Sequence, residues 1–341
     1  MKHYDAAAVA AALDDSALIE ALRATFQRET LAPPRQHHVL DQARTQTLLM
    51  MPAWDGTDAI GVKLVTVFAG NPARGLAAVN ALYVLFDAHT GAVRATLDGT
   101  ELTLRRTSAA SALASQLLSR PDSQRLLMVG TGALAPHLIR AHCRVRPIRS
   151  VAIWGRNPEH AQRLTRELRG LVSGPEPHAD HEAPAPPQRG AIPEAHVPEL
   201  HAVADLREAV AQADIISCAT LAQEPLIHGE WLIPGQHLDL VGAFNERMRE
   251  TDDAALVRAQ VFVDTRDGAR ADAGEIIHAL ASGAISPAQL LADLHELTRG
   301  LHPGRRDGTQ ITLFKSVGHA LEDLAAAQLV LAREAASRPR P

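Results

Sequence analysis

Short apolar runs alternate with helical stretches along the second half of the chain. The runs are rich in Val, Ile, Leu and Met, whereas the segments between them place apolar residues at helical spacing. The expected strands are 125–129, 150–154, about 197–203, 214–219, 237–241 and 260–264, and the expected helices include 158–169 and 204–212. Strands that alternate with helices at this interval form a doubly wound parallel sheet of the α/β class.

The first part of the chain has a different pattern. Residues 5–30 are expected to be helical, with Asp5 and Asp14 or Asp15 as N-caps. Short β-type runs then follow, separated by Asp-Gly, Gly-Asn-Pro and Thr-Gly turn signals, at 45–51, 60–66, 79–87 and 93–97. From 101 to 119 the chain is rich in Ala, Leu and Ser and reads as a helix. We therefore expect an α+β unit before the parallel sheet.

The C-terminal part returns to helices. Expected elements are helices near 273–281 and 287–298, a loop at 300–308, a strand at 311–314 and an Ala-rich helix at about 316–336. Because a long Ala/Leu helix must pack against something, we expect the last helix to return to the N-terminal unit. The predicted division is residues 1–120 plus 302–341 in one discontinuous domain, with residues 121–301 as an inserted nucleotide-binding domain.

Residues 172–198 interrupt this pattern. They are rich in Pro, His, Glu and Ala, show no periodicity, and stand where a short loop would connect a helix to a strand. We interpret them as a flexible surface insertion that carries no chemistry.

Composition narrows the class of protein. The chain has 341 residues, of which 46% are apolar and 21% charged, as in ordinary soluble proteins. A net charge of −5 gives no basic field for nucleic acid. No apolar run approaches membrane-spanning length, and the two cysteines, Cys143 and Cys218, suit a reducing cytoplasm. The seventeen histidines are scattered without zinc-type spacing, so we expect no metal.

The first predicted strand of the sheet runs into a glycine turn. The sequence Gly130-Thr131-Gly132-Ala133-Leu134-Ala135 has the spacing of a dinucleotide-binding turn, with Ala at its third small position. Its glycines let the backbone approach a pyrophosphate, and the following helix start offers free N–H groups. Ordinary turns between strand and helix share this spacing, but a second apolar run at 151–154, about one βαβ unit later, favours a dinucleotide.

The end of that second run concerns the choice of cofactor. NAD sites usually carry a carboxylate there for the ribose 2′-OH, whereas an Arg accommodates a 2′-phosphate. This chain has Arg156 and Asn157, and Asn157 also suits a helix N-cap before Pro158. We expect NADP(H) to be preferred, with NAD(H) as the alternative.

Several blocks on both sides of the glycine turn resemble the ornithine cyclodeaminase/mu-crystallin family. They are Gly61-Val-Lys63, Asp98-Gly-Thr-Glu, Leu-Arg-Arg106-Thr-Ser-Ala-Ala-Ser-Ala112, Gly130-Thr-Gly132, Thr312-Leu-Phe-Lys-Ser-Val-Gly318 and Glu322-Asp323. The resemblance covers nearly the whole chain in order. It implies a Rossmann domain inserted in a substrate-binding and dimerisation domain, and a homodimer paired through N-terminal β-structure.

The resemblance also implies a clamp for a substrate carboxylate. The matching positions are Arg35, Lys63 and Arg106, and Thr107 is expected to orient them. A planar Arg fork binds a carboxylate through two hydrogen bonds, while a Lys adds a point charge. Lys63 is the candidate proton donor, so Lys63 and Arg106 are the expected catalytic residues. Further cofactor contacts are expected from Thr220, Val241 and Gly242 at strand ends and from Lys315, which is expected to close the site.

Two departures from the family separate its reactions. Members that deaminate ornithine place acids where this chain has Leu49 and Phe244. An apolar pair suits a flat cyclic imine and leaves an ornithine δ-ammonium unpaired, which is costly in a buried site. Glu246 or Arg247 nearby offers possible compensation, so the exclusion stays open.

The sequence therefore predicts an NAD(P)H-dependent reductase that converts Δ1-pyrroline-2-carboxylate or Δ1-piperideine-2-carboxylate to L-proline or L-pipecolate. The alternatives are an NAD-dependent ornithine cyclodeaminase, an amino-acid dehydrogenase of the archaeal alanine dehydrogenase type, and a catalytically silent nucleotide-binding protein of the crystallin kind. The clamp of three cations argues against the silent protein.

Overall fold

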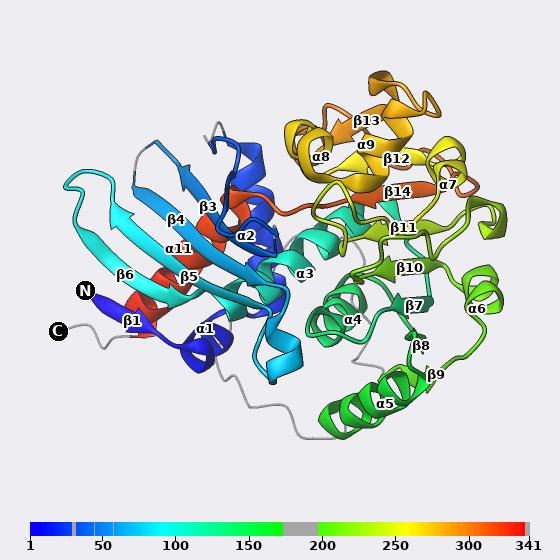
Figure 1. The fold of residues 1–341 in the computed structure, drawn as a ribbon, viewed down its shortest axis with the longest axis horizontal. Coiled ribbons are helices and arrows are strands. Elements are labelled where there is room, and N and C mark those ends of the chain that lie inside the picture. The colour runs from blue at the N-terminus through cyan, green and yellow to red at the C-terminus, as the bar shows by residue number, and fades with distance from the viewer. Residues whose placement is uncertain (29–31, 44, 57, 173–196, 338–341) are drawn as a thin grey trace.

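The computed structural model describes residues 1–28, 32–43, 45–56, 58–172 and 197–337. It contains two sheets that lie side by side, with helix α3 (Gly99–Leu118) between them (Figure 1). The predicted insertion at 172–198 lies, apart from its ends, outside the described residues.

The first sheet has six strands in the order β1-β6-β5-β4-β3-β2. They are β1 (Lys2–Tyr4), β2 (Gln36–Val39), β3 (Gln46–Trp54), β4 (Ala59–Phe68), β5 (Val79–Asp87) and β6 (Val93–Asp98). All pairs are antiparallel except β1 with β6. The short strands β1 and β2 are absent from the sequence-based prediction, since three or four residues carry too little periodicity to be recognised.

Helices cover one face of this sheet. They are α1 (Ala6–Ala12), α2 (Asp15–Gln27), α3 and the C-terminal α11 (Ala320–Ser337), and the short turn η1 (Asn71–Arg74) lies between β4 and β5. Asp5 and Asp14 cap α1 and α2, as predicted. Helix α11 packs on β3 and β4, so the last helix does return to the N-terminal part of the chain (Figure 1).

The second sheet has eight parallel strands in the order β13-β12-β14-β11-β10-β7-β8-β9. Its strands are β7 (Arg125–Val129), β8 (Ser150–Trp154), β9 (Glu199–Ala202), β10 (Ile215–Cys218), β11 (His237–Leu240), β12 (Gln260–Val263), β13 (Leu290–Asp293) and β14 (Thr312–Lys315). Its helices are α4 (Leu134–Val145), α5 (Pro158–Val172), α6 (Leu206–Gln212), α7 (Asp253–Arg258), α8 (Arg266–Asp272), α9 (Gly274–Ala281) and α10 (Leu294–Thr298), with short turns η2 (Gly229–Trp231) and η3 (Pro287–Gln289). The predicted doubly wound α/β class is confirmed.

Strand β14 differs from the expected grouping. Residues 302–341 were expected to belong with the N-terminal part, yet β14 lies inside the parallel sheet between β11 and β12. All four of its residues are buried. A four-residue strand buried on both faces needs neighbours on each side, and the gap between β11 and β12 supplies them.

The helix expected at 287–298 is wrong. The structure has the turn η3, then strand β13 beside β12, and only then the short helix α10. Pro287 begins the turn, and the carboxylate of Asp293 accepts the amide of Glu296 at 3.0 Å, which starts a new helix at Leu294. Pairing with β12 outweighs the local helical pattern of this segment.

Helix α3 joins the two sheets. The carboxylate of Asp98 caps it by accepting the amide of Glu101 at 2.7 Å. Its small Ala and Ser residues let it pack against β5, α2 and α11 on one side and against α4, β11 and β14 on the other. Ser111 donates to Asp239 of β11 at 2.9 Å in this buried contact. Side chains on α3 therefore have a fixed position relative to the parallel sheet.

In the part of the chain that the structure describes, we find no helix with the length and apolar character needed to cross a membrane.

Candidate functional site

The carboxyl ends of five parallel strands lie at one edge of the sheet, and several predicted cofactor residues are among those that follow them. Gly130 follows β7, Thr220 comes shortly after β10, and Val241 follows β11. Ser316 follows β14, and Asp264 follows β12. In open α/β sheets this edge is where ligands bind.

The glycine turn has the geometry of a dinucleotide cradle. Gly130 has φ +121°, and a Cβ there would lie 2.5 Å from the carbonyl oxygen of Ala219, so only glycine fits. A Cβ at Gly132 would meet nothing within 4 Å, which leaves open space over the turn. Helix α4 begins at Leu134 after Ala133, whose side chain forms no cap. The amide of Ala135 donates to the carbonyl oxygen of Gly132 at 3.1 Å, so a phosphate would bind to the N–H groups that precede it. These residues fit a pyrophosphate.

The loop after β8 adjoins this turn. The Thr131 methyl group packs against Gly155. A Cβ at Gly155 would lie 2.7 Å from that methyl group, so the close contact needs glycine. Asn157 accepts the amide of Glu159 at 2.9 Å through its side chain, so it does cap the start of α5. Arg156 is exposed beside it. The predicted contact of Arg156 with a ribose 2′-phosphate stays a prediction.

A buried glutamate holds the two neighbouring strand ends together. Glu250 Oε1 accepts the amide of Thr220 at 2.7 Å and its hydroxyl at 2.9 Å, and Oε2 accepts the amide of Gly242 at 2.7 Å. Glu275 in turn accepts the Glu250 amide at 2.9 Å. Burial raises the pKa of Glu250 to about 7, Lys315 opposes the rise and Glu275 adds to it. Sequence reasoning missed Glu250; an acid within an otherwise polar loop gave no signal.

Lys315 lies behind this edge rather than at its opening. Its side chain is fully buried on β14, and its Nζ is 3.5 Å from Glu275 Oε2. The position indicates a counter-charge for the Glu250–Glu275 pair. The predicted contact of Lys315 with a cofactor stays a prediction.

Lys63 and Arg106 meet over the start of α11. Lys63 points inward from β4, and its Nζ is 2.9 and 2.8 Å from the two carboxylate oxygens of Asp323. Arg106 reaches from α3 to Glu322 Oε2 at 2.5 Å through Nη1, and its Nε is 3.0 Å from Asp323 Oδ1. All four side chains are buried. Thr107, next to Arg106 on α3, is buried as well.

Arg35 approaches the same place from another part of the chain. Its Nη2 donates to the carbonyl oxygens of Val317 at 2.8 Å and Gly318 at 3.0 Å, and its Nε is 3.0 Å from Asp272. Gly318 has φ +82°, and a Cβ there would lie 2.6 Å from Arg106 Nη1. Arg35 and Arg106 therefore both contact the Val317–Gly318 segment, and Asp323 connects Arg106 to Lys63.

Asp264 fixes that segment. Its Oδ2 accepts the amides of Val317 and Gly318, each at 2.8 Å. Sequence reasoning missed Asp264, although an acid directly after an apolar strand is a usable signal for a site residue. Glu322 and Asp323 were part of the family resemblance, but the sequence predicted no role for them.

Charge and burial set the proton affinities here. Burial lowers the pKa of Lys63 to about 8, and Arg106 acts in the same direction against Asp323. Burial also acts to lower the pKa of Arg106, but Asp323 and Glu322 outweigh it, so that pKa is raised. Burial raises the pKa of Glu322 to about 7 against the effect of Arg106. The site thus holds a lysine and a glutamic acid that both titrate near neutral pH.

Leu49 and Phe244, the two apolar residues at the positions where acids are expected for ornithine deamination, are both shielded from solvent at least in part. Leu49 is buried on β3, on the face that also carries Met51, which pairs with Lys63. Phe244 is half-buried in the loop after β11, and Glu246 and Arg247 beside it are exposed. Among the described residues, no group of His, Cys, Asp and Glu could hold a metal ion.

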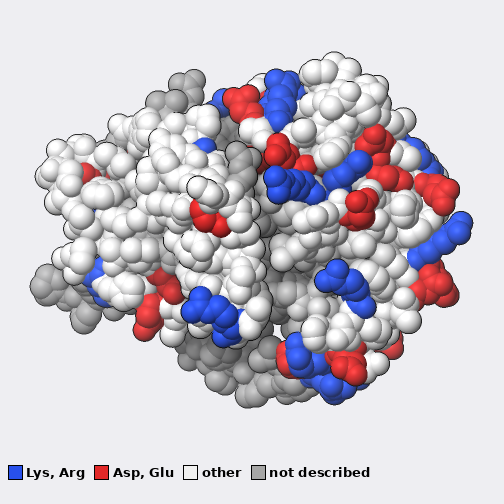
Figure 2. Space-filling view, in the orientation of Figure 1, with Lys and Arg blue, Asp and Glu red and all other residues white. Residues whose placement is uncertain are grey.

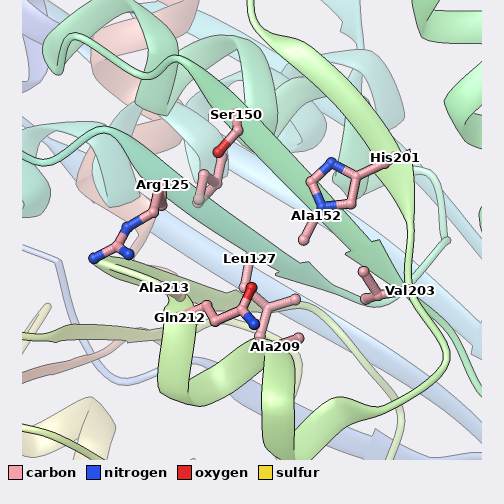
Figure 3. A pocket seen from close by; sticks show the side chains of 10 residues that line it. Arg125, Leu127, Ser150, Ala152, His201, Val203, Ala209, Gln212 and Ala213 are labelled. Atoms are coloured by element: carbon pink, nitrogen blue, oxygen red, sulfur yellow. The ribbon is translucent and has the colours of Figure 1, made fainter.

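A separate small pocket lies between α6 and strands β7, β8 and β9 (Figure 3). Its volume is about 70 Å³, and Arg125, Ser150, His201 and Gln212 are among its lining residues. None of the predicted site residues lines it, and a dinucleotide is far larger. Figure 2 shows Lys and Arg interspersed with Asp and Glu on the surface of the parallel-sheet unit, without a continuous basic patch.

Comparison with known proteins gives consistent matches. The family model for the ornithine cyclodeaminase/mu-crystallin family matches residues 4–176 and 192–338. "Protein SAR DEFICIENT 4" of Arabidopsis thaliana is 42% identical over 88% of this chain and 86% of its own. The Δ1-pyrroline-2-carboxylate reductase of Paracoccus denitrificans is 39% identical over 89% of this chain and 91% of its own.

A solved structure with the same fold is that of Thermococcus litoralis Δ1-pyrroline-2-carboxylate reductase in complex with NADH and L-proline. It is 28% identical, covers 98% of each chain, and has a TM-score of 0.88.

Proposed function

This chain belongs to the ornithine cyclodeaminase/mu-crystallin family, and on that premise we propose that it is an NAD(P)H-dependent reductase of small cyclic ketimines. The substrates are Δ1-pyrroline-2-carboxylate and Δ1-piperideine-2-carboxylate, and the products L-proline and L-pipecolate. The similarity to two Δ1-pyrroline-2-carboxylate reductases supports this substrate class.

One observation carries the proposal: three cations from separate parts of the chain gather beside the edge that carries the glycine turn. Arg35 and Arg106 contact Val317–Gly318, directly after β14, and Lys63 shares Asp323 with Arg106. Strands β14 and β7 are three places apart in the sheet, which is about 14 Å at the usual strand spacing. A dinucleotide with its pyrophosphate at Gly130 spans such a distance and would bring its nicotinamide toward the cations.

In this mechanism the clamp binds and orients the substrate. The planar guanidinium of Arg106 donates hydrogen bonds to the substrate carboxylate, and Arg35 and Lys63 add positive charge. Leu49 and Phe244 give the flat ring apolar surroundings and offer no partner to an ornithine δ-ammonium. A reduced nicotinamide supplies the hydride when bound, and Thr220, Val241 and Gly242 position it.

Lys63 holds the proton that the imine nitrogen needs. An imine accepts hydride readily only when its nitrogen is protonated. With its pKa at about 8, Lys63 is mostly protonated at neutral pH and still acidic enough to donate. Asp323, bonded to the ammonium group, keeps its direction fixed.

The test is a direct assay. The protein is mixed with NADPH or NADH and either cyclic imine, and the loss of reduced-cofactor absorbance is followed; L-ornithine with trace NAD and an ammonia assay is the control. We expect imine reduction and no ammonia. Ammonia from ornithine without imine reduction would instead identify an ornithine cyclodeaminase.

Replacing Gly318 by alanine tests the clamp. The new Cβ would lie 2.6 Å from Arg106 Nη1, so Arg106 must move, and kcat/KM for the imine should fall by about a hundredfold while cofactor affinity is unchanged. Gly283→Ala is the matched control, since Gly283 has a similar φ of +75° with nothing within 4 Å. Equal kinetics of the two variants would mean that Arg106 has no such role.

We propose that NADPH is preferred to NADH because the exposed Arg156 follows β8 where acids usually bind the ribose hydroxyl. Arg156→Ala should raise the Kd of NADPH by about tenfold and leave that of NADH nearly unchanged, as for the loss of a charge-assisted hydrogen bond. Fluorescence titration of the reduced cofactors measures both. A variant that weakens both cofactors equally would remove the 2′-phosphate assignment.

We also propose a homodimer through the uncovered face of the six-stranded sheet. Alternate residues of the paired strands β3, β4 and β5 point to this face and make it apolar. They include Met50, Trp54, Val62, Leu64, Leu82 and Val84. Figure 2 shows few charges on this half of the molecule. An apolar patch of this kind in a water-exposed position is typical of an interface.

The free cysteines, Cys143 and Cys218, support the expected cytoplasmic location.

Leu64→Glu tests the dimer. Leu64 lies at the centre of the face, opposite Met50 and Leu82, and a buried charge without a partner there should dissociate the dimer. Light scattering after gel filtration should report the mass of one chain. Leu301→Glu adds the same charge at a site that is 71% exposed and should stay dimeric. A wild-type chain that is already monomeric would contradict the proposal.

A further inference from the structure

The cation cluster contains more acids than bases. Arg35, Lys63 and Arg106 are accompanied by Asp264, Asp272, Glu322 and Asp323, all within the contacts described above. With every group ionised, three positive charges face four negative ones. A substrate carboxylate would add a fifth negative charge to a buried site.

Of these four acids, Glu322 has the fewest contacts that stabilise its ionised carboxylate. Its side chain is fully buried, and Oε2 contacts Arg106 Nη1 at 2.5 Å. Among the described residues no donor reaches Oε1. Asp264, by contrast, accepts two backbone amides, and Asp323 contacts both Lys63 and Arg106. A buried carboxylate with one ionic partner depends on that partner for its ionisation.

The charged groups around Glu322 come from several elements. Arg106 faces it from α3, and Lys63 contributes from β4. Asp264 after β12 and Asp323 on α11 are like charges that oppose its ionisation. His319, directly before the start of α11, is neutral at physiological pH because burial lowers its pKa to about 4. In the described part of the chain, Arg106 is the one side chain that stabilises the ionised carboxyl of Glu322 through a direct contact.

We propose that Glu322 takes up a proton when a substrate carboxylate binds to Arg106, so that one negative charge replaces another in the buried site. The inference rests on the proposed function, because it takes Arg106 as the carboxylate-binding group. The incoming anion either shares the guanidinium with Glu322 or replaces it there. In both cases Glu322 loses part of the interaction that keeps it ionised.

The direction of the pH effect follows. The pKa of Glu322 is about 7 before binding, and a neighbouring anion raises it further. Below that value the residue already carries its proton, and little is taken up. Above it, each bound carboxylate brings a proton, so affinity falls with rising pH by up to about tenfold per pH unit.

Calorimetry with pyrrole-2-carboxylate tests the proposal. This ligand has the shape and carboxylate of the imine but no group that titrates near neutral pH. It is bound to the cofactor-saturated protein at about pH 7.5 in two buffers of different ionisation enthalpy, which gives the number of protons taken up. We expect more than about half a proton per ligand for the wild-type chain.

Glu322→Gln should remove most of that uptake and make the affinity fall less steeply with pH than in the wild-type chain from about 6.5 to 8. Glu208→Gln, on the surface of α6, should behave as wild type. If Glu322→Gln does not fold, a wild-type chain that binds the ligand without proton uptake still overturns the inference.

The outcomes separate this inference from the proposed function. Ligand binding without proton uptake in the wild-type chain would overturn the inference and leave the reductase intact. Equal uptake by wild type and Glu322→Gln would assign the proton to another group, such as Lys63, and would also overturn it. No binding at all, together with no imine reduction, would remove the proposed function itself.

Discussion

Replacing Arg106 by alanine is expected to lower kcat/KM for Δ1-pyrroline-2-carboxylate by about a thousandfold or more. The planar fork holds the substrate carboxylate, and losing one partner of a buried charge pair costs about 2–5 kcal/mol in binding. Steady-state kinetics at saturating NADPH measures the loss. The Kd of NADPH should remain unchanged, since the glycine turn lies on another element.

The structure adds a second effect of this change. Arg106 is the partner of Glu322 and Asp323, so Arg106→Ala leaves buried carboxylates without it and should cost about 3–5 kcal/mol of stability. Arg106→Lys keeps the charge but not the fork, and separates the loss of stability from the loss of binding. Arg105→Ala is the matched control, because Arg105 donates to Glu101 and to the Leu13 carbonyl oxygen instead of the Glu322–Asp323 pair. Equal loss in both variants would contradict the assignment.

Replacing Lys63 by methionine is expected to lower kcat by about a hundredfold to ten-thousandfold, as for the loss of a general acid. It also removes the pH dependence that Lys63 causes. In the wild-type enzyme the acid must be protonated, and its pKa is lowered to about 8, so kcat should fall as the pH rises through 8. Measuring kcat against pH for both proteins tests this.

Lys63→Arg separates the two roles of the residue. Arginine keeps the positive charge for the substrate carboxylate but does not release its proton in this pH range. KM should change less than kcat, and the decline above pH 8 should disappear. A wild-type profile without that decline would mean that another group supplies the proton.

The sequence predicted the parallel sheet because each of its strands is a local pattern. Apolar runs such as 125–129 and 150–154 were identified with their observed bounds, and the glycine turn after the first run was located as well. Strand β13 failed because its four residues have no pattern of their own and are held by pairing with β12. The grouping of β14 failed for the same reason, since neighbours in space decide it.

For the site, the sequence by itself determined which side chains are available: three cations, a glycine turn and an exposed Arg156. It did not determine their partners. The ionic and hydrogen bonds of Lys63, Arg106 and Arg35 join residues 260, 216 and 282 positions apart. Such contacts depend on how α3, α11 and the parallel sheet pack, and the same packing removes water from Lys63 and Glu322. Only the tertiary structure therefore decided which groups titrate near neutral pH, because burial and long-range pairing, rather than residue type, set their proton affinities.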